Sequence, residues 1–104
     1  MKIKLTSLAS FKLVKLLNYL EEEWSTKTKL KFIEKMNDKF EILKSTPEIF
    51  PISQTRPDLR KLVITKQSIA LYKVEQEVIY IITIFDSRQN SSEIENEIKK
   101  HFGL

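Results

Sequence analysis

The sequence predicts an α+β domain in which an antiparallel helical hairpin packs on an antiparallel β-sheet meander. Apolar residues recur with the period of a helix through residues 8–43, and runs rich in β-branched and aromatic residues follow between residues 59 and 85. A short alternating segment precedes the helices, and a polar helical segment follows the strands. The expected order is therefore an N-terminal strand, two helices, three strands and a short C-terminal helix.

Length and composition bound the class of protein. A chain of 104 residues with 41% hydrophobic content and one glycine fits a single domain over residues 1–104. No apolar run approaches the roughly 20 residues that span a membrane, and the first residues do not resemble a signal peptide, so we expect a cytoplasmic protein. The absence of cysteine excludes disulfides, thiolate catalysis and cysteine-ligated metals.

The balance of charge is mildly basic. Lysine and arginine number 18 against 14 acidic residues, which gives a net charge of +4 and a pI near 9.3. Two interpretations stay open: scattered lysines that keep a small domain soluble, or a surface that binds an acidic partner such as nucleic acid or an acidic protein.

The first half of the chain predicts a strand and two helices. Residues 2–5 alternate polar and apolar, and Ser7 is placed to cap the helix that follows. A second helix begins after a break and cap at Ser25 and Thr26, and so short a link favours an antiparallel hairpin. The expected buried stripes are Leu13, Leu16, Leu17, Leu20 and Trp24 in residues 8–24, and Leu30, Ile33, Met36, Phe40 and Leu43 in the second helix.

The second half predicts a loop and three strands. Pro47 ends the hairpin, because proline disfavours helix at the residue before it, and a loop with two further prolines follows. Strands are expected at residues 59–65, 68–74 and 78–85. Their short links favour an antiparallel meander, although neither link contains the glycine or asparagine that tight hairpin turns prefer.

A final polar helix opens at Ser91 and carries Ile94 and Ile98 on one face. One face of the sheet is expected to hold the core. The opposite face and the strand ends are then the places where charged residues can be presented.

Few residues suggest catalysis or a metal site. His101 is the only histidine and lies near a helix end, where it is expected to interact with the last carbonyls. Glu21, Glu22 and Glu23 are consecutive in a helix and point in different directions, so they cannot converge on one ion. Since Gly103 is the only glycine, phosphate-binding glycine loops are excluded, and we expect no cofactor and no metal.

The arginines are the more informative residues. Lysine greatly outnumbers arginine, yet Arg60 begins a strand next to Lys61, Arg88 follows a strand, and Arg56 lies in the preceding loop. Guanidinium groups suit bidentate contacts with phosphate or carboxylate. Ordinary surface positions are the alternative, and Asp86 is placed to pair with Arg88. Arg60 and Arg88 come close in space only if strand order and register allow it.

Three polar aromatic residues, Trp24, Tyr72 and Tyr80, have two open interpretations. Each can pack in the core, which we favour, or stack on a nucleic-acid base. Tyr72 can also hydrogen-bond across the sheet.

These elements together resemble the RelE/ParE family of type II toxin–antitoxin toxins over essentially the whole chain. The resemblance is carried by the following segments: Tyr19-Leu20-Glu21-Glu22-Glu23-Trp24-Ser25 at the end of the first helix, Pro47-Glu48-Ile49-Phe50-Pro51 after the second, the Arg-Lys-Leu-Val-Ile and Leu-Tyr-Lys-Val strands, and Phe85-Asp86-Ser87-Arg88-Gln89-Asn90 after the last strand. It implies a bacterial growth-inhibiting toxin, which a cognate antitoxin neutralises in a toxin–antitoxin hetero-oligomer.

The resemblance implies one of two targets. RelE-like members cleave mRNA in a ribosome-dependent reaction, and ParE-like members poison DNA gyrase. The basic positions of the nuclease fall on Arg60, Leu62 and Ile69, of which only Arg60 is basic, and Arg88 matches a later arginine. Leucine and isoleucine transfer no protons. We therefore favour the ParE-like branch, without a chemical step, and expect Arg60, Lys61 and Arg88 to bind the target.

The alternatives are a ribosome-dependent mRNA endonuclease and an inactive member that only binds its antitoxin. The antitoxin is expected to present an acidic, amphipathic segment. Four lysines, Lys27, Lys29, Lys31 and Lys35, either guide that segment or form a plain solvated face.

Overall fold

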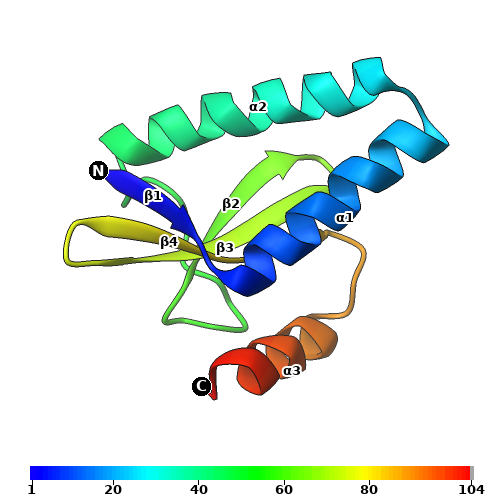
Figure 1. The fold of residues 1–104 in the computed structure, drawn as a ribbon. Helices are drawn as coiled ribbons and strands as arrows, with labels where there is room; N and C mark the ends of the chain where they lie inside the picture. The colour runs from blue at the N-terminus through cyan, green and yellow to red at the C-terminus, as the bar shows by residue number, and fades with distance from the viewer. Residues whose placement is uncertain (104) are drawn as a thin grey trace.

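The computed structural model describes residues 1–103 and confirms the expected order of elements (Figure 1). The elements are β1 (Lys2–Leu5), α1 (Ser7–Glu23), α2 (Thr26–Ser45), β2 (Arg60–Thr65), β3 (Ser68–Glu75), β4 (Val78–Asp86) and α3 (Ser91–Phe102). The two long helices form the hairpin, and the three later strands form the antiparallel meander.

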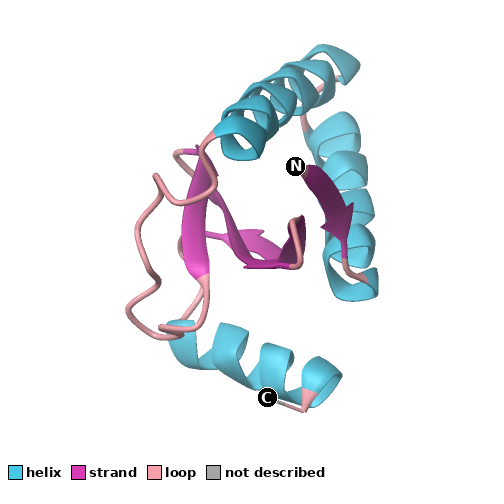
Figure 2. Cartoon of the chain, turned by 90° about the vertical axis from the view of Figure 1, so that its left-hand side faces the viewer, coloured by secondary structure: helices cyan, strands magenta, loops and turns pink. Residues whose placement is uncertain are grey.

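The four strands form one mixed sheet in the order β1-β4-β3-β2. β1 lies beside β4 and runs parallel to it, with Ile3 opposite Ile79 and Leu5 opposite Ile81. The parallel pairing is possible because the long helical hairpin connects β1 to the meander and returns the chain to the same end of the sheet. Figure 2 shows the hairpin on one side of the sheet and α3 on the other.

The predicted cap of the first helix is shifted by one residue. Thr6, rather than Ser7, is the N-cap of α1, and its Oγ1 accepts a hydrogen bond from the Ala9 amide at 3.1 Å. The same hydroxyl donates to the carbonyl of Ile82 at 2.8 Å, which ties the start of α1 to β4. Ser25 caps α2 as predicted.

The main core lies between the hairpin and the sheet. Its buried members are Ala9, Phe32, Met36, Leu43, Leu62, Ile64, Ala70, Tyr72, Ile79, Ile81 and Ile84. The predicted burial is wrong for two members of the stripes, since Trp24 is 69% exposed and Leu30 is 56% exposed. Trp24 lies in the connection between α1 and α2, which Figure 1 shows beyond the ends of the strands. Leu30 lies on the side of α2 that faces away from the buried residues Phe32, Met36 and Leu43.

A bulge in β4, which lies between β1 and β3, changes which of its side chains face each side of the sheet. The register with β3 shifts between Leu71 and Tyr72, which leaves Ile82 as an extra residue in β4. Ile81 and Ile84 therefore both pack in the main core, although residues three positions apart in a regular strand point to opposite faces, and Ile82 packs on the other face.

The second face of the sheet is not the open charged face that the sequence suggested. Instead, the apolar stripe of α3 packs against this face and forms a second buried cluster with it. The buried members are Leu59, Leu71, Ile82, Ile94 and Ile98. Glu97 on α3 fastens this layer by pairing with Lys12 of α1 at 2.6 Å and accepting from Thr83 of β4 at 3.4 Å.

The end of α3 matches its prediction. The Nδ1 atom of His101 lies 3.0 Å from the Glu97 carbonyl, and Gly103 adopts the left-handed conformation (φ 67°) that ends the helix.

The two-residue link between β3 and β4 lacks the glycine or asparagine that its backbone conformation favours. Gln76 and Glu77 both have positive φ, 49° and 65°, as a two-residue hairpin turn requires. Side chains other than glycine and asparagine adopt this conformation reluctantly, and the long ladder between β3 and β4 compensates.

The loop over residues 46–59 is fixed to the sheet rather than hanging free. The hydroxyl of Tyr72 donates to the Pro47 carbonyl at 2.5 Å, and the rings of Tyr72 and Phe50 meet edge to face, 6.5 Å apart. Tyr72 thus packs in the core as predicted, but its hydroxyl reaches the loop and not a neighbouring strand. Burial raises the pKa of Tyr72, so the hydroxyl stays a donor at neutral pH.

We expect Tyr72→Phe to lower the free energy of unfolding by about 1 kcal/mol, because it removes one partly buried hydrogen bond and keeps the ring. Urea denaturation followed by circular dichroism measures the change. Tyr80→Phe is the matched control, since the Tyr80 hydroxyl makes no hydrogen bond to any residue within 1–103. An equal loss in both variants would contradict the assigned role.

Candidate functional site

The strand register separates the two arginines that the sequence singled out. Arg60 at the start of β2 lies opposite Tyr72, whereas Asp86, two residues before Arg88, lies opposite Ser68. Ser68 and Tyr72 are four positions apart in β3, about 13 Å at roughly 3.3 Å per residue. Arg60 and Arg88 therefore lie toward opposite ends of the sheet and do not form one site.

The Arg60 guanidinium is engaged within the protein. Its Nη1 donates to the carbonyls of Phe50 at 2.7 Å and Glu48 at 3.3 Å, so the side chain holds the loop against β2. Lys61, the next residue, is exposed and lies on the opposite face of the strand, as alternation requires. It lines a groove of about 350 Å³ beside the start of α3.

Arg56 also has a structural partner. It is buried and donates from Nε and Nη2 to the Asp58 carboxylate at 3.0 and 2.8 Å. These hydrogen bonds raise the pKa of Arg56 and lower that of Asp58. The pair stiffens the loop that precedes β2.

Arg88 is the predicted arginine that faces solvent. Its side chain is 76% exposed, and its Nε and Nη2 donate to the two oxygens of Asp86 at 3.0 and 2.8 Å. The backbone amide of Arg88 donates to the same carboxylate at 2.8 Å. These bonds lower the pKa of Asp86 to about 2 and raise that of Arg88. The expected Asp86–Arg88 pair is confirmed, and it orients the guanidinium while leaving most of it in water.

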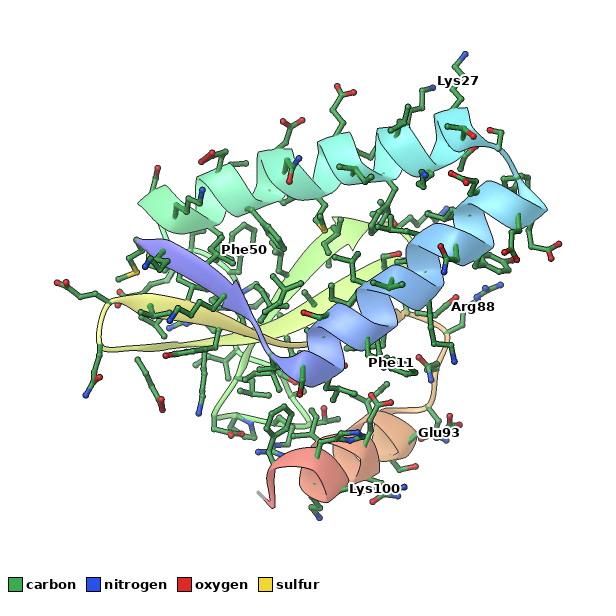
Figure 3. All side chains as sticks on the ribbon, in the orientation of Figure 1. Phe11, Lys27, Phe50, Arg88, Glu93 and Lys100 are labelled. Carbon is green, nitrogen blue, oxygen red and sulfur yellow. The ribbon has the colours of Figure 1, made fainter. Side chains whose placement is uncertain are left out.

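A groove of about 850 Å³ opens beside Arg88, between the helical hairpin and the ends of the strands. We call it the basic groove. Its charged lining residues are Lys12, Lys15, Lys31, Lys35, Arg88 and the single acid Asp86, and two exposed aromatic residues, Tyr19 and Trp24, complete its rim. Figure 3 shows Arg88 reaching outward beside α1.

The basic groove has an excess of uncompensated positive charge. Lys12 is paired with Glu97, and Arg88 with Asp86. Lys15 lies over the ring of Phe11, with Nζ 5.4 Å from the ring centre. Within residues 1–103, no acidic side chain forms an ion pair with Lys15, Lys31 or Lys35.

Sequence reasoning missed most of this groove. Lys12, Lys15 and Tyr19 share one helical stripe at i, i+3 and i+7, and Lys31 and Lys35 share another at i and i+4. This spacing is the signal in the sequence from which the groove could have been predicted. Of the four lysines considered for an antitoxin, Lys31 and Lys35 lie in the groove, whereas Lys29 is paired with Glu21.

Two of the positions that a RelE-like nuclease would use, Leu62 and Ile69, are apolar and buried. Leu62 packs in the main core, and Ile69 is 7% exposed. Arg60 and Leu62 share one face of β2, whereas Ile69, opposite Val63, lies on the other. The arrangement offers no acid–base pair on the nuclease positions.

No metal site is formed by the described part of the chain, which contains no cluster of three or more histidine, cysteine, aspartate or glutamate residues suited to an ion. Among the same residues, no helix is both long and apolar enough to cross a membrane.

We expect the carboxyl of Asp86 to titrate near pH 2, and to shift upward toward its ordinary value of 3.8 in Arg88→Ala. The shift should be incomplete, because the backbone amide still donates to the carboxylate. Since the folded pKa lies below the unfolded one, the pair stabilises the fold above pH 3.8 and loses this effect as the pH falls through about 2. Carboxyl ¹³C shifts followed against pH measure both values. A midpoint that does not move in the variant would refute the pairing.

Comparisons with known proteins fit this geometry. The family model described as ParE toxin of type II toxin–antitoxin system, parDE, matches residues 3–91. A solved structure described as the chromosomal ParDE TA system from P. aeruginosa shares the fold, with a TM-score of 0.64 and 20% sequence identity over 83% of this chain and 95% of that one. No curated protein matches the chain. Because the family model covers most of its length, the chain belongs to the ParE family of toxins of type II toxin–antitoxin systems.

Proposed function

We propose that this chain inhibits bacterial growth by poisoning DNA gyrase in the cytoplasm and that a cognate antitoxin neutralises it. The observation that carries the proposal is membership of the ParE family, together with an exposed, oriented Arg88 at the mouth of the basic groove. A binding poison needs a surface that grips its target, and it needs no chemical step of its own.

The buried nuclease positions support this choice over mRNA cleavage. General acid–base catalysis needs titratable groups within hydrogen-bond reach of the reacting ribose. Leu62 and Ile69 are apolar and withdrawn from the surface, so a RelE-like mechanism would need a rearranged set of residues.

We propose different roles for the three residues expected at the target interface. Arg88 and Lys61 are exposed, and each is proposed to contact the target directly. Arg60 is proposed to act as a positioning residue, since its guanidinium holds the carbonyls of Glu48 and Phe50 and thereby fixes the loop edge that the target meets.

The antitoxin is proposed to form a hetero-oligomer with this chain through an acidic segment. Lys31 and Lys35 supply uncompensated positive charge to such a segment, and the net charge of +4 favours its approach. Lys29 contributes less, because Glu21 already partners it.

We expect tightly controlled induction of the chain to stop DNA synthesis before protein synthesis, and Arg88→Ala to relieve growth inhibition at least tenfold in colony counts, because the oriented guanidinium is lost. Pulse labelling with thymidine and methionine measures the order of arrest. Lys100→Ala is the control, since Lys100 is an exposed cation on α3, outside both grooves.

Two results would overturn the proposal. Protein synthesis stopping first, with transcripts cut in the ribosomal A site, would identify a nuclease. Normal growth despite abundant, folded protein would identify an inactive member that only binds its antitoxin.

A pair of variants separates positioning from contact. We expect Arg60→Ala to lower toxicity and also to lower the free energy of unfolding by about 1–2 kcal/mol, because two carbonyls lose a charged donor. Lys61→Ala should lower toxicity while leaving the free energy of unfolding within about 0.5 kcal/mol, because its side chain is exposed. Colony counts and urea denaturation, performed on both variants, measure the two effects. Equal stability losses in both would remove the distinction.

A further inference from the structure

The surface that the basic groove offers to a ligand is cationic and aromatic rather than aliphatic. Its aliphatic lining residues, Leu16, Leu20 and Ile84, are buried in the main core or packed against it. The large apolar side chains left exposed in the groove are aromatic, Tyr19 at 53% and Trp24 at 69%. The exposed apolar surface of the groove is therefore aromatic, which suits a ligand with flat rings.

The cations come from three separate elements around one opening. Lys15 lies on α1, Lys31 and Lys35 lie on α2, and Arg88 follows β4. Three of these four charges have no acidic partner within residues 1–103, and most of the Arg88 guanidinium is in water. A ligand with regularly spaced negative charges can release counterions from several of them at once.

The aromatic residues at the rim fit the same kind of ligand. Trp24 is the C-cap of α1, and Tyr19 lies five residues before it. A nucleic-acid base is a flat ring that can stack on an exposed aromatic side chain. Successive bases along a strand are joined through phosphate groups, which carry the negative charge that the lysines would bind. Polar groups of Thr65, Gln67 and Ser68, where β2 turns into β3, can hydrogen-bond to phosphate or sugar.

We infer that the basic groove binds a single strand of DNA, with phosphates on Lys15, Lys31, Lys35 and Arg88 and a base stacked on Trp24 or Tyr19. We choose DNA rather than RNA as the ligand because the proposed target, gyrase, cuts and passes DNA. This choice rests on the proposed function. The toxin would then hold both the gyrase protein and the DNA strand that gyrase exposes. Single strands are favoured over duplex because stacking requires accessible base faces.

Fluorescence anisotropy of the purified chain with a labelled DNA strand of about 12 nucleotides tests this directly, without gyrase. With four cations on phosphates at about 0.7 each, the logarithm of the binding constant should fall against the logarithm of salt with a slope of about −3. Lys31→Ala should reduce that slope by about 0.7. Trp24→Ala should weaken binding at least about fivefold and leave the slope unchanged, as lost stacking requires.

Lys100→Ala is the matched control for charge, and it should leave both affinity and slope unchanged. Equal weakening in Lys100→Ala and Lys31→Ala would show diffuse attraction and overturn the site. So would a failure to bind DNA at low salt, or binding of an RNA strand of the same sequence without binding of DNA.

The two proposals fail separately. If the chain arrests DNA synthesis in cells but does not bind the strand in vitro, the inference fails and the proposed function stands. If the strand binds with the expected slope but induction leaves growth normal, the groove stands and the proposed function fails.

Discussion

The burial of β4 on both of its faces is the constraint on which the rest of the structure depends. This strand has β1 on one side and β3 on the other, the helical hairpin above it and α3 below it. A regular strand of nine residues would divide its apolar side chains strictly by parity. The extra residue at Ile82 breaks that parity, so Ile81 and Ile84 meet the hairpin while Ile82 meets α3. Both helical layers therefore pack against the same strand.

The arginines show how one side-chain type takes opposite roles within a small domain. Arg56 donates from Nε and Nη2 to Asp58, and Arg60 donates to loop carbonyls, so both residues stiffen the segment that joins the hairpin to the sheet. Arg88 has a partner only two residues away, which orients it without removing it from water. A charge that is oriented before binding loses less conformational entropy when a partner arrives. Of the three residues expected to meet the target, Arg88 is therefore the one whose local geometry most favours contact.

Much of the fold could be predicted because local physics decides it. Helical periodicity located α1 and α2, β-branched runs located β2 to β4, and the cap at Ser25 was found because a capping hydroxyl acts on its own next turn. Periodicity predicts Trp24 and Leu30 in the core, and both are exposed, because the pattern fixes neither how far the sheet extends beneath a helix nor which side of the helix faces it. The pattern of a single segment also cannot predict that α3 covers the second face of the sheet or that β4 has a bulge at Ile82.

The sequence by itself determined the order of elements, the excess of positive charge, the family resemblance and the pairing of Asp86 with Arg88, because each depends on composition or on residues close together in the chain. Only the tertiary structure decided that Arg60 and Arg88 lie toward opposite ends of the sheet, that Leu62 and Ile69 are buried, and that lysines from two helices surround one groove with Trp24. These features depend on strand register and on the packing of helices against strands. Both are set by the combined burial of residues far apart in the chain, and no local pattern encodes that sum.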